Sequence, residues 1–165
     1  MRKPVVGVMG GSKANQAVQA SARKLGALIA EQEWVLLNGG RNTGVMTASA
    51  EGAREAGGLV IGILPDTTRT KASPHLDVAV VTGLHDGRNL INVLSSDVVI
   101  ACPGGLGTLS EIVLALKHDR RVILLGFDVG EDFDRYRRRG RLTRAETPEE
   151  AVAQAVDALR DSTPP

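Results

Sequence analysis

The chain has 165 residues, of which 42% are hydrophobic and 2% aromatic, and its formal net charge at pH 7 is +1. This length suits one domain over residues 1–165, and the near-neutral charge gives no general field that would attract nucleic acid or a membrane. A single cysteine excludes an intrachain disulfide, and the first apolar run, residues 5–9, is too short for a signal sequence or a membrane span. We therefore expect a soluble, cytoplasmic protein.

Short apolar runs alternate with longer amphipathic segments through the first half of the chain. The apolar runs are rich in valine, leucine and isoleucine, as is typical of buried strands, and the longer segments have hydrophobic residues at helical spacing. A polar loop that could cover a site follows at residues 66–74. We expect strands at residues 4–9, 34–37 and 59–64 and helices at residues 15–31 and 45–56.

The second half continues the alternation. Residues 128–140 are highly charged, and we expect them to be irregular. Thr147 and Pro148 are typical of a helix start, with a glutamate at the third helical position. We expect strands at residues 77–81, 98–101, 121–127 and near Leu142, helices at residues 86–95, 108–117 and 147–160, and a frayed tail at residues 160–165.

Strands that alternate with helices predict a single-domain α/β protein with a doubly wound, Rossmann-like and mostly parallel sheet, covered by helices on both faces. Three glycine-rich turns each follow a predicted strand. In such folds ligands bind beyond the carboxyl ends of the strands, so the three turns should meet around one ligand site. The turns contain Gly10, Gly11 and Ser12, then Gly39, Gly40 and Arg41, and finally Gly104, Gly105 and Gly107.

The third turn is the most informative of the three. It runs from Pro103 through Leu106 to Thr108, between a buried strand and a helix, and its glycines let the backbone approach a ligand closely. Unpaired N–H groups at a helix N-terminus favour an anion. We predict that these N–H groups and the Thr108 hydroxyl bind a phosphate. The alternative is a tight connection that binds no ligand.

Two charged residues admit two interpretations each. Glu111 stands three residues after Thr108, so the pair forms either a capping box or a functional carboxylate beside the phosphate. Arg88 lies in the first turn of a predicted helix, where the helix dipole disfavours a cation, so we expect an anionic ligand or Glu111 to compensate it. The alternative for Arg88 is a solvated surface position. Ser12 and Arg41 either contact the ligand or are polar turn residues.

Residues 103–111 match the PGGxGTxxE signature of the LOG (Lonely Guy) family, whose members are often mislabelled as lysine decarboxylases. The resemblance extends from Val5 to Phe127. It implies the Rossmann-like fold, a homodimer or higher homo-oligomer, and a phosphoribohydrolase that cleaves nucleoside 5′-monophosphates into free base and ribose 5-phosphate. Arg88 and Glu111 occupy the positions of the catalytic pair of that family.

Two departures point to a shorter bacterial branch that includes molybdenum cofactor carrier proteins. Asn89 stands where the enzymes usually have lysine, and Arg41 replaces a third glycine. We therefore favour a carrier or binding protein for a phosphate-bearing ligand, a nucleotide or a pterin such as molybdenum cofactor, that requires no cofactor of its own. The phosphoribohydrolase is the alternative, and lysine decarboxylation is disfavoured. The predicted ligand-binding residues are Gly10, Gly11, Ser12, Gly39, Gly40, Arg41, Arg88, Pro103, Gly104, Gly105, Leu106, Gly107, Thr108 and Glu111.

Other residue types give little support for further sites. The three histidines, His75, His85 and His118, lack metal-ligand spacing, so we predict no metal bound by protein ligands. The arginine-rich segment 135–141 follows several acidic residues and is interpreted as a solvated charged face rather than a nucleic-acid site.

Overall fold

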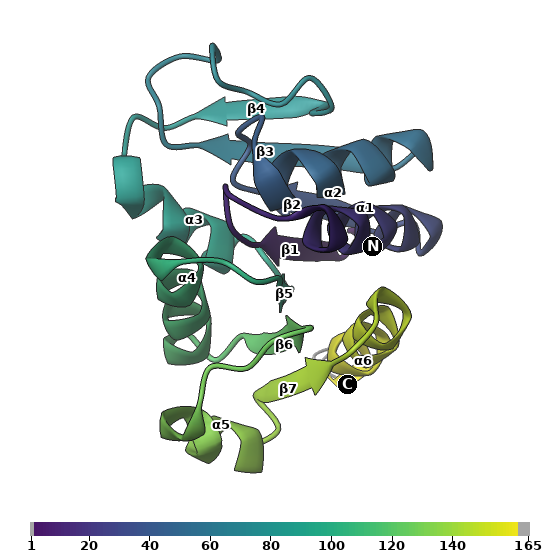
Figure 1. Ribbon diagram of the computed structural model, residues 1–165, viewed down its shortest axis with the longest axis vertical. Helices are drawn as coiled ribbons and strands as arrows, with labels where there is room; N and C mark the ends of the chain where they lie inside the picture. The colour runs from purple at the N-terminus through teal and green to yellow at the C-terminus, as the bar shows by residue number, and fades with distance from the viewer. Residues whose placement is uncertain (1, 162–165) are drawn as a thin grey trace.

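The computed structural model describes residues 2–161, which form a seven-stranded sheet in the order β4-β3-β2-β1-β5-β6-β7 (Figure 1). Every neighbouring pair of strands is parallel, so the predicted doubly wound fold is confirmed. The strands are β1 (Val5–Met9), β2 (Val35–Asn38), β3 (Leu59–Leu64), β4 (Val78–Val81), β5 (Val98–Ala101), β6 (Arg121–Leu125) and β7 (Leu142–Ala145). The helices are α1 (Gln16–Glu31), α2 (Gly44–Glu55), α3 (Arg88–Leu94), α4 (Leu106–Lys117), α5 (Asp134–Arg138) and α6 (Pro148–Asp161), with short 3-10 helices η1 (His85–Gly87) and η2 (Glu131–Phe133).

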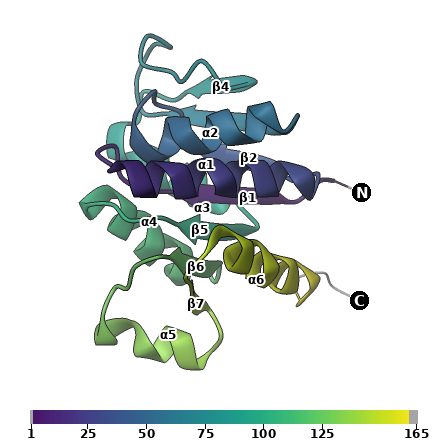
Figure 2. The same cartoon turned by 45° about the vertical axis from the view of Figure 1, so that its right-hand side comes forward.

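Helices cover both faces of the sheet (Figures 1 and 2). Alternate strand residues point to opposite faces, which separates the interior into two hydrophobic clusters. One cluster joins Val6, Leu36 and Ile100 to α1, α2 and α6, and the other joins Val99 and Leu124 to α3 and α4. Strands β2, β3 and β4 follow one another on one side of β1, and strands β5, β6 and β7 follow one another on its other side. The strand order therefore reverses between β1 and β5, which pair directly. Ligands of such sheets bind at this reversal point, beyond the carboxyl ends of the strands.

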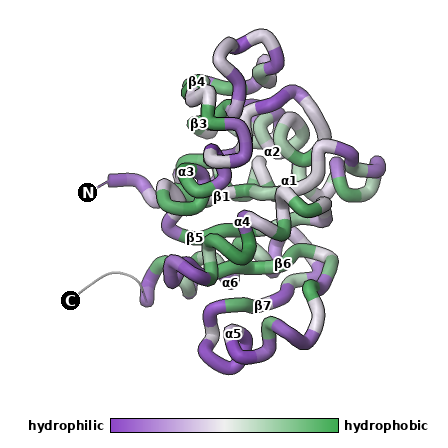
Figure 3. Tube along the Cα trace, turned by 90° about the vertical axis from the view of Figure 1, so that its left-hand side faces the viewer, coloured by the Kyte–Doolittle hydropathy of each residue, from purple (hydrophilic) through white to green (hydrophobic). Residues whose placement is uncertain are grey.

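Hydrophobic and hydrophilic segments separate clearly along the chain (Figure 3). Strands β5 and β6 are hydrophobic, whereas α5 is almost wholly hydrophilic. Within residues 2–161, no helix has the length and apolar character needed to cross a membrane.

The predicted boundaries need five corrections, the first of which is that β6 ends at Leu125 and not at residue 127. Residues 128–140 are not irregular throughout, because they contain η2 and α5, whose Arg137 pairs with Asp128 and Asp134. The predicted helix 86–95 is a turn of 3-10 helix followed by α3, and α4 begins at Leu106 rather than residue 108. Residues 160 and 161 belong to α6, while the rest of the predicted frayed tail lies outside the described residues.

The predicted start of α6 is confirmed, but the glutamate side chain bonds to the residue before the cap and not to the cap itself. The Glu150 N–H donates to Thr147 Oγ1 at 3.2 Å, as expected of an N-cap residue. The Glu150 carboxylate accepts from the N–H of Glu146 at 2.8 Å, one residue before the cap.

Candidate functional site

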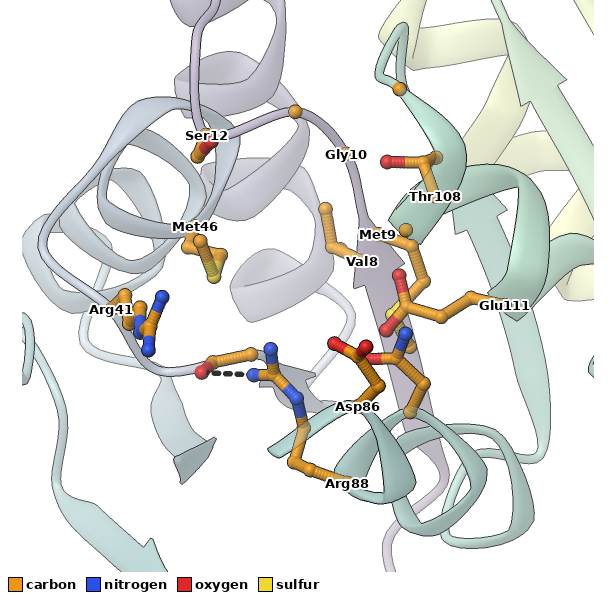
Figure 4. A pocket seen from close by; sticks show the side chains of 15 residues that line it. Val8, Met9, Gly10, Ser12, Arg41, Met46, Asp86, Arg88, Thr108 and Glu111 are labelled. Atoms are coloured by element: carbon orange, nitrogen blue, oxygen red, sulfur yellow. Dashed lines mark hydrogen bonds between the residues drawn. The ribbon is translucent and has the colours of Figure 1, made fainter. Parts of the chain in front are cut away.

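A cavity of about 320 Å³ opens at the carboxyl end of β1, where the three glycine turns converge (Figure 4). It is bounded by the end of β1, by the turns after β1 and β2, and by the first turns of α3 and α4. The predicted ligand-binding residues in its wall are Gly10, Gly11, Ser12, Gly39, Arg41, Arg88, Gly105, Gly107, Thr108 and Glu111. Val8, Met9, Met46, Asp86 and Asn89 also line it and were not among those predicted.

Four predicted residues lie outside the cavity wall. Pro103 and Gly104 line a neighbouring groove that shares Gly11 and Ser12 with the cavity. The side chain of Leu106 is 85% exposed, on the outer side of α4. Gly40 is buried, and its N–H donates to Asn38 Oδ1 at 2.8 Å, so it shapes the second turn from behind.

The third turn holds the start of α4 against the first turn. The Gly11 N–H donates to the Pro103 carbonyl oxygen at 3.0 Å. A Cβ on Gly104 would lie 2.1 Å from Thr108 Oγ1, so a glycine is required there. Gly105 is the N-cap of α4, and no side chain caps the helix. Its first N–H groups are therefore available to an anion at the cavity mouth.

Glu111 does not form the capping box that was one of its two interpretations from the sequence. Because α4 starts two residues earlier than the pattern suggested, Thr108 is inside the helix and is not its cap. The Glu111 side chain is buried, and its Oε1 accepts from Asn92 Nδ2 at 2.8 Å. Burial raises the pKa of Glu111 to about 7, although the Asn92 hydrogen bond and the charge of Arg88 act in the opposite direction.

Arg88 anchors the second turn rather than lying free on the surface. Its Nη1 donates to the carbonyl oxygens of Gly39 and, at 2.8 Å, of Ile63. A Cβ on Gly39 would lie 2.4 Å from Nη1, so glycine makes room for the guanidinium. Burial lowers the pKa of Arg88, and Nε has no partner within residues 2–161. These carbonyl oxygens compensate the cation in the first turn of α3, and in the described chain Arg88 and Glu111 form no direct ion pair.

Arg41 is already engaged by a carboxylate. Its Nε and Nη2 donate to the two oxygens of Asp66 at 3.0 and 2.8 Å, which lowers the pKa of Asp66. The predicted covering loop, residues 66–74, lies along the second turn, where the Asn42 N–H donates to the Lys71 carbonyl oxygen at 2.9 Å. Asp66 is the loop residue that bonds to the side chain of Arg41 in the cavity wall.

Asn89 is held by a short chain of hydrogen bonds. Its Nδ2 donates to Ser110 Oγ at 3.0 Å, and Ser110 Oγ donates to the Gly107 carbonyl oxygen at 2.7 Å. Asp86 lies one helical turn before Asn89. This spacing of three residues places both on one side of the η1–α3 segment, but on so short a segment no sequence pattern shows that this side faces the cavity.

No group of three or more His, Cys, Asp or Glu side chains that could hold a metal ion occurs within residues 2–161. The cavity therefore combines backbone N–H groups at one end with buried carboxylate and amide oxygens at the other. This arrangement suits a small molecule that has both an anionic group and hydrogen-bond donors.

Comparisons with known proteins agree on the family. The sequence model of the SLOG cluster4 family matches residues 3–152. The solved molybdenum cofactor binding protein of Rippkaea orientalis is 48% identical, with a TM-score of 0.89, and the match covers 97% of this chain and 99% of that one. The molybdenum cofactor carrier protein of Chlamydomonas reinhardtii is 40% identical, with a TM-score of 0.88, and the match covers 96% and 99%.

A more distant relative is an enzyme. The cytokinin riboside 5′-monophosphate phosphoribohydrolase of Mycobacterium tuberculosis is 34% identical over 112 residues. That match covers 63% of this chain and 60% of the length of the relative.

Proposed function

Because this chain belongs to the SLOG cluster4 family, we propose that it binds molybdenum cofactor, a pterin with a phosphate group, and carries it without turnover. The observation that carries the proposal is the uncapped start of α4 at Gly105, which opens into the cavity. A free helix N-terminus binds phosphate through its N–H groups and its partial positive charge. The similarity to two solved cofactor-binding proteins over nearly the whole chain supports the same function.

The residues in the cavity suit such a ligand. Gly105 and Gly107 line the cavity beside Thr108 and contribute no side chains to it, so a phosphate can reach the first turn of α4. Two buried groups can bond to the polar atoms of the ring. They are the Arg88 Nε, which has no partner in the described chain, and the Glu111 carboxylate. When bound, the cofactor would supply the molybdenum chemistry to a partner enzyme, and the chain would hold and shield it.

The proposal is tested by what the purified protein contains. Protein from cells grown with molybdate should retain molybdenum and a phosphate-bearing pterin in equal amounts, measured by elemental analysis and by fluorescence of the oxidised pterin. A Gly105→Asp variant, which places a carboxylate at the phosphate position, should contain neither. Retention of the pterin by this variant would contradict the assignment of the phosphate to the α4 turn.

A phosphoribohydrolase is the second candidate, because Arg88 and Glu111 line one cavity and the pKa of Glu111 is about 7. A carboxyl with such a pKa suits acid–base or electrostatic assistance near neutral pH. Incubation with AMP and its N6-modified analogues decides between the candidates. Release of ribose 5-phosphate that Glu111→Ala abolishes would establish the enzyme, and no release is expected of a carrier.

We also infer that the protein is a homodimer that pairs through α3 and α4. Both helices have large exposed hydrophobic side chains: Leu94 on α3 and Leu106, Leu109 and Val113 on α4. Exposed apolar surface of this kind marks contact sites between proteins, and a second copy presents a matching face. We further propose a cytoplasmic location, with which the free thiol of Cys102 is compatible.

A further inference from the structure

The two ends of the cavity differ in chemistry. The outer end has hydrogen-bond donors, namely the first N–H groups of α4 and the hydroxyl groups of Ser12 and Thr108. The other, inner end has three acceptor side chains, the carboxylates of Asp86 and Glu111 and the amide of Asn89, and one cation, Arg88, whose Nη1 is already engaged by two carbonyl oxygens. Figure 4 shows the Asp86 and Glu111 carboxylates directed into the same part of the cavity. An acceptor-rich end requires a ligand that presents donors to it.

Glu111 is a fixed acceptor at this inner end. Its side chain is only 7% exposed, and one oxygen, Oε1, is held by Asn92 Nδ2 at 2.8 Å. The other oxygen, Oε2, has no hydrogen-bond partner within residues 2–161, and the carboxylate faces the cavity (Figure 4). A carboxylate has about four acceptor sites, so most of the capacity of Glu111 remains for a ligand. Leaving a buried charged acceptor unpaired is unfavourable, which makes a donor group the matching occupant.

Asn89 adds a second acceptor of defined orientation. Because its Nδ2 donates to Ser110 Oγ at 3.0 Å, the amide oxygen is the free end of the side chain. Ser110 is fixed in turn by its bond to the Gly107 carbonyl oxygen. The inner end therefore selects donors through its side-chain chemistry.

The distance between the two ends suits a ring system. Six residues separate Gly105 from Glu111 on α4, which corresponds to a rise of about 9 Å along the helix. A phosphate at the helix start and the Glu111 side chain therefore belong to different turns of α4. The space between them must be filled by the body of the ligand, with its far edge at Glu111.

We propose that Glu111 recognises the 2-amino-4-oxo edge of the ligand ring, so that the cavity selects pterin-type and guanine-type rings over adenine-type rings. This inference rests on the proposed function, because it takes the phosphate to lie at the α4 turn. The 2-amino-4-oxo edge presents a ring N–H beside an exocyclic amino group, and these two parallel donors match the two oxygens of a carboxylate. Adenine presents an unprotonated ring nitrogen next to its amino group, so its lone pair would face the buried carboxylate.

Four phosphate-bearing probes separate the parts of this proposal. Titration calorimetry at pH 8, where the Glu111 carboxylate is ionised, compares GMP, IMP, AMP and ribose 5-phosphate. GMP should bind about tenfold to a hundredfold more tightly than AMP, as expected of hydrogen bonds to a buried charge. IMP, which has the ring N–H without the amino group, should lie between them. Ribose 5-phosphate reports the phosphate site alone.

Glu111→Gln gives the decisive comparison, because a glutamine amide has one donor and one acceptor and matches the adenine edge. The variant should lose the preference for GMP without weakening AMP, and it should still bind ribose 5-phosphate. Glu31→Gln, an exposed position at the far end of α1, is the matched control and should behave as the native protein. Retained ribose 5-phosphate binding also reports that the variant is folded.

The outcomes distinguish this inference from the function on which it rests. Equal affinities for GMP and AMP, or a GMP preference that survives in Glu111→Gln, would overturn the role of Glu111 while leaving the phosphate site intact. Failure of ribose 5-phosphate and of all three nucleotides to bind would overturn the phosphate site itself, and the inference with it.

Discussion

Replacement of Gly105 by aspartate should move stability and ligand affinity in opposite directions. Gly105 is the N-cap of α4 with extended backbone angles, φ −98° and ψ −152°, and a Cβ placed there meets no atom within 4 Å. The fold therefore accepts a side chain at this position. Aspartate is a better N-cap than glycine and its charge complements the helix dipole, so the unliganded variant should gain about 0.5–1 kcal/mol. For a chain of this length, that gain raises the melting temperature by about 1–4 °C.

The same carboxylate should exclude a phosphate. Two unit charges about 4 Å apart repel by about 4 kcal/mol at the effective dielectric constant typical of a protein surface, and a phosphate monoester carries more than one charge. Each 1.4 kcal/mol changes affinity tenfold, so ribose 5-phosphate should bind at least about a hundredfold more weakly.

Calorimetric titration with ribose 5-phosphate, together with thermal melting of the unliganded protein, measures both effects. Gly105→Asn is the matched control, because it caps the same N–H groups without a charge, and its loss of affinity should be smaller. If Gly105→Asp bound ribose 5-phosphate as tightly as the native protein, the anion site would not be at the start of α4.

Three further predictions follow from the site and its surroundings. Burial raises the pKa of Glu111 to about 7 in the folded state, against the opposing effects of the Asn92 hydrogen bond and the Arg88 charge. The folded state therefore binds this proton more tightly than the unfolded chain, and the stability of the native protein relative to Glu111→Gln should rise by about 2 kcal/mol between pH 8 and pH 5.5 in denaturant titrations. A flat difference would mean that Glu111 has an ordinary pKa. Asp66→Asn should release Arg41 and tighten inorganic phosphate binding severalfold by calorimetry, and an unchanged affinity would place Arg41 outside the anion site. Val113→Glu on α4 should give monomers in light scattering. Val78→Glu is the control, because Val78 is equally exposed but lies on β4, and this variant should stay dimeric. A dimer in both variants would exclude the α4 interface.

The architecture and the meeting of the three turns follow from the sequence, because uninterrupted apolar runs such as residues 98–101 specify buried parallel strands. In a parallel sheet the residues after each strand must lie at one edge. For this reason Gly10, Gly39 and Gly105 were placed together correctly although they are far apart in the chain.

The role of Glu111 was harder to predict, since it depended on a helix boundary. Leu106 is exposed and Gly107 is a poor helix former, so neither contributes to an apolar pattern, and the start of α4 was placed two residues too late. With that shift Thr108 resembled a cap and Glu111 its partner. The burial of Glu111 and its contact with Asn92 depend on how α3 packs against α4, which no local pattern encodes.

Residues 128–140 show a different limit of sequence analysis. The segment forms η2 and a helix of only five residues, and it is held by Arg137, which bonds to Asp128, Asp134 and the Gly130 carbonyl oxygen. Elements this short lack a hydrophobic period, so their charges resemble those of an irregular loop. Asp86 and Asn89 were missed for a related reason, because they lie on a short helical segment whose inner side becomes visible only in three dimensions.

Anaerobic equilibrium dialysis of the purified protein against molybdenum cofactor tests the carrier function most directly. The account predicts saturable binding of one pterin and one molybdenum per chain, displaced by excess phosphate or ribose 5-phosphate and lost in Gly105→Asp. A protein that bound no cofactor but released ribose 5-phosphate from nucleoside 5′-monophosphates would contradict it.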